Sequence, residues 1–266
     1  MQSRDIPWRE YNVHDDHGST GNPTQEDEEG WCQPVDIFAP KEEEVYELRE
    51  YKFDHGGDDG EGDSDGGNTG KEMTITLRER SDYDVSTGMS VWQGAEILCQ
   101  YLTARPAART AVRGRRVLEL GAGTGLCGLV AAGVLGAAIV RLTDGDGAVL
   151  RNLRGNVARN GLGDRASCPQ LIWGAARAAE FAREHGRHDV VLATDCVYVT
   201  KSVRPLFETV ARLLTPKDGV FLFVNSCAST CPLEEVMRIG KEFGFTVSSA
   251  CYQPISEKDP VFVFRR

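Results

Sequence analysis

The chain contains 266 residues, of which 41% are hydrophobic and 26% are charged, and its formal net charge is −10 at pH 7. This length suits one α/β domain with extensions. No apolar run approaches the roughly 20 residues needed to cross a bilayer, and residues 1–16 lack the blocks of a signal peptide, so we expect no membrane segment and a cytoplasmic or nuclear location. The acidic balance argues against nonspecific binding to nucleic acid, because the phosphates would be repelled. We expect a monomer, although the composition does not fix the oligomeric state.

The eight cysteines lie mostly inside apolar segments and form no C-x-x-C pair. This pattern predicts free, reduced thiols. Cys227 and Cys231 are close in the sequence, but no histidine or second cysteine pair completes a set of four zinc ligands. We therefore predict no metal site.

The N-terminal third is predicted to be an appendage. Residues 1–40 are polar and are predicted to be a largely disordered extension. Within 41–89, residues 45–53 and 73–80 alternate apolar with polar side chains, which predicts the two strands of a β-hairpin. Between them, residues 54–70 contain six acidic residues and seven glycines, which predicts a disordered acidic loop. This loop is either a solvated insertion, which we favour, or an arm that attracts a basic partner or weakly binds calcium.

Residues 90–266 form the predicted main domain. Helical spacing over 91–102 predicts a helix, and Pro106 lies beyond its end. Alternating elements then follow, with strands over 116–121, 138–143, 168–173, 189–194 and 219–226, and helices over 126–135, 147–159, 175–184, 202–214 and 233–243. Two final strands, over 246–252 and 261–265, follow each other as an antiparallel hairpin. The pattern predicts an α/β fold with a mostly parallel, doubly wound sheet.

The sequence VLELGAGTGLCG at 117–128 predicts a buried strand, a glycine-rich turn and a helix. Glycines at 121, 123 and 125 would leave no Cβ between the chain and a ligand, and the helix N-terminus would offer N–H groups to polar ligand atoms. From Gly123, the same letters satisfy G-x-G-x-x-G. The turn alone therefore allows either S-adenosylmethionine (SAM) or a nicotinamide dinucleotide.

Ligands of doubly wound sheets bind outside the carboxyl ends of the strands, so the residues that follow each strand are informative. Asp144 follows the second strand and could accept both hydroxyls of a ribose, whereas Asp146 is the better candidate to cap the next helix. Trp173 follows the third strand, where an adenine ring could lie, although a tryptophan is as often a core residue. Asp195 and Tyr198 follow the fourth strand. We favour a functional pair over a capping aspartate with a surface tyrosine.

Taken together, these segments resemble the seven-β-strand, SAM-dependent protein-lysine methyltransferases grouped as methyltransferase family 16. The matching pieces are Ser90–Ala95 (SVWQGA), Glu119–Gly125 (ELGAGTG), Thr143-Asp144, Trp173-Gly174 and Asp195–Tyr198 (DCVY), the last being the family's D-x-x-Y signature. In addition, residues 143–145 and 153–156 are similar to the calmodulin-lysine and elongation-factor-2-lysine branches, respectively. The resemblance implies a Rossmann-like class I methyltransferase fold.

The resemblance also implies roles for individual residues. The implied cofactor-binding set is Trp92, Glu119, Gly121, Ala122, Gly123, Asp144, Trp173 and Thr194. In this scheme Asp144 binds the ribose hydroxyls, Trp173 borders the adenine, and Trp92 covers the other side of the cofactor. Thr194 stands where relatives often have alanine. Asp195 and Tyr198 would line the lysine entrance and carry catalysis.

The implied function is transfer of a methyl group from SAM to the ε-amino group of a lysine in a protein substrate. Three alternatives remain open at this point: a SAM-binding scaffold without catalysis, a methyltransferase acting on arginine, histidine, an N-terminus or a small molecule, and an NAD-dependent oxidoreductase. The last explains neither the Trp-Gly nor the D-x-x-Y strand end. The substrate protein, its lysine and the number of methyl groups cannot be read from the sequence.

Overall fold

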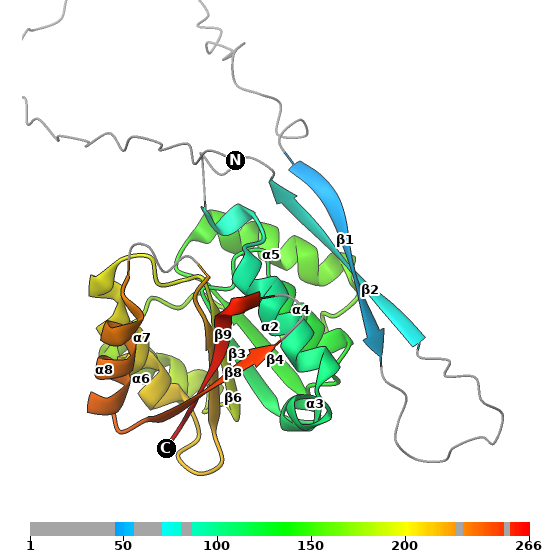
Figure 1. Cartoon of the computed structure of the whole chain (residues 1–266). Coiled ribbons are helices and arrows are strands. Elements are labelled where there is room, and N and C mark those ends of the chain that lie inside the picture. Colours follow the sequence, from blue (N-terminus) through cyan, green and yellow to red (C-terminus); the bar gives the residue numbers. More distant parts are fainter. Residues whose placement is uncertain (1–45, 56–70, 81–86, 227–230, 253–255) are drawn as a thin grey trace, which may run out of the picture. The chain divides into compact units, whose positions relative to one another are not determined.

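The structure is a computed structural model that describes residues 46–55, 71–80, 87–226, 231–252 and 256–266 (Figure 1). The predicted N-terminal extension and nearly all of the predicted acidic loop lie outside these residues. Asp54 was predicted to belong to that loop, but it lies in a strand and pairs with Glu72. Among the described residues, no helix is both long enough and apolar enough to cross a membrane.

A seven-stranded sheet forms the centre of the main domain, with the order β5-β4-β3-β6-β7-β9-β8. Its strands are β3 (Arg116–Leu120), β4 (Ile139–Thr143), β5 (Ala166–Ser167), β6 (Val190–Thr194), β7 (Val220–Val224), β8 (Thr246–Tyr252) and β9 (Ser256–Arg265). Strands β3 to β7 pair in parallel, whereas β9 pairs antiparallel with both β7 and β8. The strand order reverses between β3 and β6, which is where a doubly wound sheet binds its ligand.

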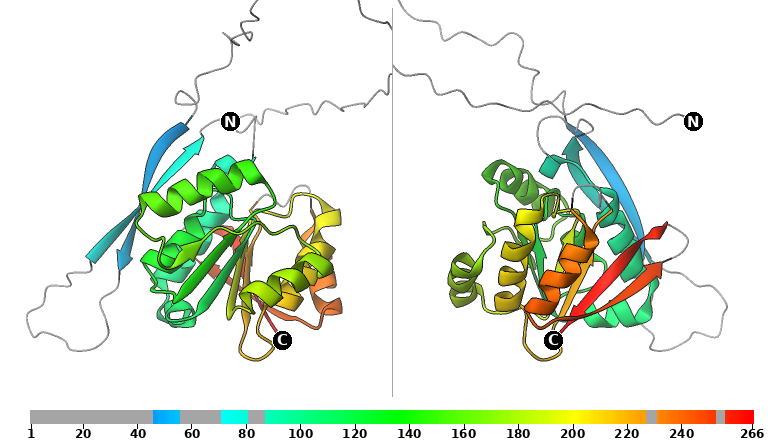
Figure 2. Two further views of the ribbon diagram at one scale, coloured as in Figure 1. Left: turned by 180° about the vertical axis from the view of Figure 1, so that it is seen from behind. Right: turned by 60° about the vertical axis from the view of Figure 1, so that its left-hand side comes forward.

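Helices cover both faces of the sheet because its strands are apolar on both sides (Figure 2). In β6, for example, Val190 and Leu192 belong to one core cluster, and Val191 and Ala193 belong to the other. The first cluster contains residues of α2 (Gln93–Ala104), α3 (Pro106–Val112), α4 (Leu126–Gly133) and α5 (Gly147–Arg159). The second contains residues of α6 (Ala175–His185), α7 (Val203–Leu213) and α8 (Leu233–Glu242). Two short 3-10 turns are η1 (Thr87–Met89) and η2 (Thr200–Ser202).

The N-terminal hairpin consists of β1 (Tyr46–His55) and β2 (Lys71–Arg80), and it confirms the two predicted strands. Ile75 and Leu77 of β2 are fully buried and belong to the first core cluster. Strand β2 also contacts α4 and α5. The hairpin is therefore packed onto the helices that follow β3 and β4.

The structure confirms the predicted fold class, and the differences from the predicted elements have local causes. The strand predicted over 168–173 is only the two-residue β5 plus an isolated bridge from Asp144 to Gln170. Pro169 lacks an N–H group and cannot continue the ladder. Pro106 was read as lying beyond a helix, but it begins α3, because proline is favoured in the first turn of a helix. Strand β9 begins earlier than predicted, at Ser256.

Candidate active site

The glycine turn after β3 is fixed by backbone hydrogen bonds. Ala122 N–H donates to the carbonyl of Thr143 at the end of β4 (2.9 Å), and Gly125 N–H donates to the carbonyl of Ala122 (2.8 Å). Gly121 and Gly123 have φ angles of 63° and 56°, in the left-handed region where only glycine is routinely comfortable. The turn therefore keeps its shape through its own backbone.

The glycines are required by protein neighbours as well as by any ligand. A Cβ on Gly121 would lie 2.7 Å from Cys196 Cβ, and one on Gly123 would lie 3.2 Å from the carbonyl oxygen of Gly88. Gly125 differs from the prediction, because its Cβ would collide with side chains of the core, the first of them Leu153. The third glycine thus serves the packing of α4 and α5, whereas Gly121 and Gly123 remain half-buried at the edge of the sheet.

Glu119 is only 3% exposed, and its Oε2 accepts a hydrogen bond from Gly128 N–H in the first turn of α4 (2.8 Å). Burial raises the pKa of this carboxyl group to about 8, although the bond from Gly128 opposes the shift. Helix α4 has no side-chain cap of its own, so Glu119 supplies one from β3. This geometry favours an indirect role for Glu119, in which it fixes the turn. Ala122 is also buried and faces the first core cluster.

Asp144 lies at the carboxyl end of β4, next to the glycine turn. Its Oδ2 accepts the N–H of Gly123 (3.2 Å), and its Oδ1 accepts the N–H of Asp146 (3.0 Å). Burial raises the pKa of Asp144, while these backbone donors lower it. Asp146 caps α5 through Ala148 N–H (2.7 Å), which confirms the predicted division of labour between the two aspartates.

Three further residues predicted to bind the cofactor lie at or near this edge. Trp173 is half-buried, and its Cζ2 would lie 3.4 Å from a Cβ on Gly121. Thr194 is the last residue of β6 and is half-buried. Trp92 immediately precedes α2, and its indole N–H donates to the carbonyl of Thr87 (2.8 Å). Through the contact of Gly88 with Gly123, the segment that carries Trp92 lies against the glycine turn.

Asp195 joins three elements that are far apart in the sequence. Its Oδ2 accepts the N–H of Gly94 in the first turn of α2 (2.7 Å) and the hydroxyl of Ser226 (2.7 Å), and its Oδ1 accepts the N–H of Ser226 (2.5 Å). The backbone of Asp195 has a φ of 46°, which is uncommon for a residue other than glycine. Helix α2 has no side-chain cap within its own sequence. A negative carboxylate at its N-terminus stabilises it.

Tyr198 is 56% exposed, three residues beyond Asp195. A capping aspartate followed by a surface tyrosine was the less favoured interpretation of the D-x-x-Y segment. The structure gives Asp195 that capping role and leaves the tyrosine ring accessible to a partner. The two descriptions are compatible, since a carboxylate held by three donors is also a fixed negative charge at the edge of the sheet.

Sequence reasoning missed the residues that hold Asp195 and its surroundings. Gly94 has no room for a side chain, because a Cβ there would lie 2.5 Å from Asp195 Oδ2. Ser226 follows β7 and had no distinguishing pattern. Next to it, Asn225 is 4% exposed, and neither polar atom of its side chain has a hydrogen-bond partner. Inspecting the residues after β7 as closely as those after the other strands would have found both.

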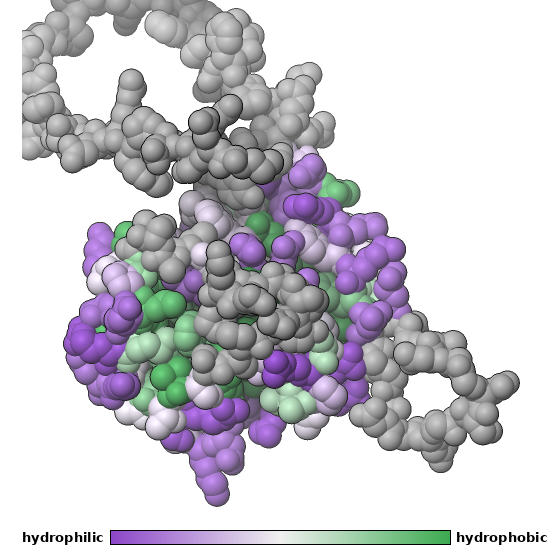
Figure 3. All heavy atoms as spheres, in the orientation of Figure 1, coloured by the Kyte–Doolittle hydropathy of each residue, from purple (hydrophilic) through white to green (hydrophobic). Residues whose placement is uncertain are grey.

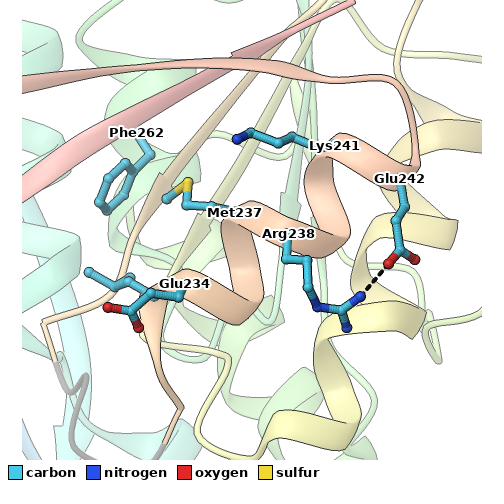
Figure 4. Close-up of a pocket in the computed structure, with 7 residues that line it drawn as sticks. Glu234, Met237, Arg238, Lys241, Glu242 and Phe262 are labelled. Atoms are coloured by element: carbon cyan, nitrogen blue, oxygen red, sulfur yellow. Dashed lines mark hydrogen bonds and ion pairs between the residues drawn. The ribbon is translucent and has the colours of Figure 1, made fainter.

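The two hollows identified in the described surface lie away from these residues. The larger, of about 790 Å³, lies between α8 and β9 and is lined by Leu233, Met237 and Phe262 with charged side chains around them (Figure 4). It coincides with a hydrophobic patch bordered by hydrophilic residues (Figure 3). The smaller, of about 480 Å³, is lined by residues of β1 and α2. Neither contains a predicted site residue. In the described part of the chain, no cluster of His, Cys, Asp and Glu is arranged to hold a metal ion.

Comparison with known proteins connects this geometry to a family. A family model described as lysine methyltransferase matches residues 70–229. The mouse protein N-lysine methyltransferase METTL21A is 31% identical over 188 residues, which cover 69% of this chain and 80% of the relative. The calmodulin-lysine N-methyltransferase of Arabidopsis thaliana is 26% identical over 175 residues, which cover 62% of this chain and 56% of the relative. Other relatives are covered over 46% to 58% of their length. The chain thus spans about half the length of several relatives that it matches.

Solved structures support the fold alone. A candidate SAM-dependent methyltransferase from Streptococcus mutans aligns with a TM-score of 0.52 at 16% identity, covering 72% of this chain and 53% of that one. A candidate RNA methyltransferase from Pyrococcus horikoshii aligns with a TM-score of 0.51 at 16% identity, covering 71% and 92%. The fold is an α/β methyltransferase fold, and with the family match over residues 70–229, this chain belongs to the lysine methyltransferase family.

Proposed function

We propose that the protein transfers a methyl group from SAM to the ε-amino group of a lysine in another protein. The observation that carries this proposal is the fixed carboxylate of Asp195, held by Gly94 and Ser226 beside the reversal of strand order. Membership of the lysine methyltransferase family supports the choice of a lysine acceptor. The relatives are named for different substrates, so we do not name the target protein.

The residues after β3 and β4 fit the cofactor. Asp144 offers a carboxylate at the carboxyl edge of the sheet, which is the acceptor that the two hydroxyls of a ribose require. Trp173 and Trp92 are both half-buried aromatic side chains, and each could cover a face of a bound nucleoside. Gly121 and Gly123 would let the ligand approach the backbone, with Glu119 and Ala122 maintaining the turn behind them. When bound, SAM supplies an activated methyl group on a positively charged sulfur.

The residues after β6 and β7 fit the acceptor. A lysine with its ordinary pKa of about 10.4 is almost fully protonated at neutral pH, and it must lose that proton before it can attack. The Asp195 carboxylate attracts and orients the ammonium group, and desolvation at the edge of the sheet favours release of the proton to water. Tyr198 holds the side chain through its hydroxyl group or its ring, whose attraction for a cation contributes about 0.5–2 kcal/mol.

We also propose that the protein acts as a monomer on a protein substrate in the cytoplasm or the nucleus. Its net charge of −10 would favour a basic region around the target lysine. Light scattering of the purified chain tests the monomer, and imaging of a tagged chain in cells tests the location.

The test of the proposed function is a labelling experiment with matched variants. The purified protein is incubated with methyl-labelled SAM and a fractionated cell extract, and the products are resolved by gel and mass spectrometry. We expect a labelled band containing methyl-lysine that disappears in Asp195→Asn, a variant that keeps an acceptor for Gly94 N–H but loses the charge. SAM affinity, measured by calorimetry, should be preserved in that variant.

Asp144→Ala is the complementary variant, because it should weaken SAM binding about 10- to 100-fold by removing charged hydrogen bonds. Retained methylation in Asp195→Asn at equal SAM occupancy would remove the charge of Asp195 from the mechanism. SAM binding without any labelled product in active extracts would favour a scaffold. Absence of SAM binding would overturn the proposal.

A further inference from the structure

Three asparagines of α5 form a row that faces the N-terminal hairpin. Asn152, Asn156 and Asn160 are spaced by four residues, so they share one face of the helix. Asn160 accepts the N–H of Thr76 through Oδ1 (2.9 Å) and donates to its carbonyl through Nδ2 (2.8 Å). Asn156 and Asn152 do the same for Arg78 between them. The row thus takes the place of a neighbouring strand along β2.

Asn156 makes one contact that the other two do not. Its Nδ2 donates to the carbonyl oxygen of Thr124 (3.0 Å), while its Oδ1 accepts the N–H of Arg78 (2.8 Å). Thr124 lies between Gly123 and Gly125 in the glycine turn, and Asn156 is fully buried. One carboxamide therefore bonds the hairpin on one side and the cofactor turn on the other.

This contact acts on a part of the turn that a ligand would feel. Gly123, the residue before Thr124, donates its N–H to Asp144 Oδ2, the carboxylate proposed to bind the ribose. A buried carbonyl that loses its partner is costly, by roughly 1–3 kcal/mol, so the position of Thr124 is sensitive to Asn156. The matching contacts of Asn160 end at Thr76 and at the carbonyl of Asn156, and they do not reach the turn.

We propose that Asn156 is a positioning residue for the cofactor site, through which docking of the N-terminal hairpin fixes the glycine turn. As far as it concerns SAM, the proposal rests on the proposed function. The hairpin is then part of the binding site's framework, although the residues that it contributes do not belong to the glycine motif.

Asn160→Ala is the matched control, since both variants remove hydrogen bonds to β2 from the same helix face. Hydrogen–deuterium exchange of the ligand-free proteins is compared at equal folded fraction. We expect Asn156→Ala to increase exchange at least fivefold in peptides that cover residues 121–128, and Asn160→Ala to leave these peptides within twofold of the wild type. Equal exchange in the two variants would overturn the proposal, whether or not the protein is a methyltransferase.

SAM binding gives the second measurement. Calorimetry should show about a tenfold weaker dissociation constant for Asn156→Ala, as expected for loss of about 1.4 kcal/mol, and a change of less than twofold for Asn160→Ala. Should Asn156→Ala fail to fold, Asn156→Asp replaces it, because it retains the acceptor for Arg78 but loses the donor to Thr124. Unchanged SAM affinity in a folded Asn156 variant would contradict the proposal. Failure of the wild type to bind SAM would contradict the proposed function and leave the exchange result to decide this inference.

Discussion

The carboxyl edge of the sheet has two halves that are built in different ways. The cofactor half consists of the turn after β3 and of Asp144 after β4, and its joining bond connects residues 21 positions apart. The acceptor half consists of Asp195, Gly94 and Ser226, whose bonds connect residues 101 and 31 positions apart. The first half is a local motif that recurs as a recognisable string. The second is assembled by the fold, so no string of residues represents it.

The strongest way to break the comparison is Gly94→Ala. The added Cβ would meet Asp195 Oδ2 at 2.5 Å, so the carboxylate must move, although the fold of α2 has no other reason to reject alanine. We expect methyl transfer to fall by about a hundredfold or more, a size typical of a displaced charged group in an active site. Steady-state transfer at saturating SAM measures it.

The control for this variant is SAM affinity, which should stay within about twofold, because the cofactor half is untouched. Gln93→Ala, an exposed neighbour in the same first turn of α2, should have little effect on either quantity. If Gly94→Ala weakened SAM binding as much as transfer, the two halves would be one unit and the distinction would fail.

The same contrast explains what the sequence could and could not predict. The parallel sheet, its helices and the position of Asp144 follow from hydrophobic periodicity and from the rule that ligands bind where strand order reverses. Pro106 and Pro169 were misread because proline can either begin a helix or interrupt a strand, and only the neighbouring elements decide between these effects. Ser226 and Asn156 were missed because a serine or an asparagine gains its role from partners brought together by folding.

Glu119→Gln sharpens the cofactor half through its pH dependence. The pKa of Glu119 is about 8 in the folded protein and about 4.3 in an unfolded chain, so unfolding releases a proton between these values. The contribution of the neutral form is complete below about pH 4 and is lost as pH rises through about 8. Wild-type stability should therefore decrease over this range relative to Glu119→Gln, by on the order of 2 kcal/mol.

Urea unfolding at several pH values checks this prediction. Glutamine stays neutral and can still accept the Gly128 N–H, so the cap of α4 is preserved in the variant. Parallel stability curves for the two proteins from pH 5 to pH 9 would show that Glu119 is ionised in the folded state. In that case the carboxylate would have to be compensated by more than the bond from Gly128.

Ser226→Ala is a milder test of the acceptor half. It removes the hydroxyl bond to Asp195 Oδ2 but keeps the backbone donor to Oδ1. Loss of one hydrogen bond to a charged group predicts roughly a tenfold decrease in transfer, with unchanged SAM affinity. Ser226→Thr, which restores a hydroxyl group, should recover part of the activity. An unaffected Ser226→Ala enzyme would show that the backbone alone is sufficient to hold Asp195.

Asn225→Leu probes the boundary between stability and function in the same half. Asn225 is buried with both polar atoms unpartnered, which costs the folded protein free energy, and leucine has nearly the same shape without polar atoms. We expect the free energy of unfolding to rise by about 1 kcal/mol. Asn152→Leu is the matched control, since Asn152 also has an unpartnered oxygen but donates to the carbonyl of Arg78, and there the substitution should destabilise. A stabilised Asn225→Leu protein with reduced transfer would show that the buried amide serves the acceptor, whereas destabilisation equal to that of Asn152→Leu would show that it has a hydrogen-bond partner in the folded protein.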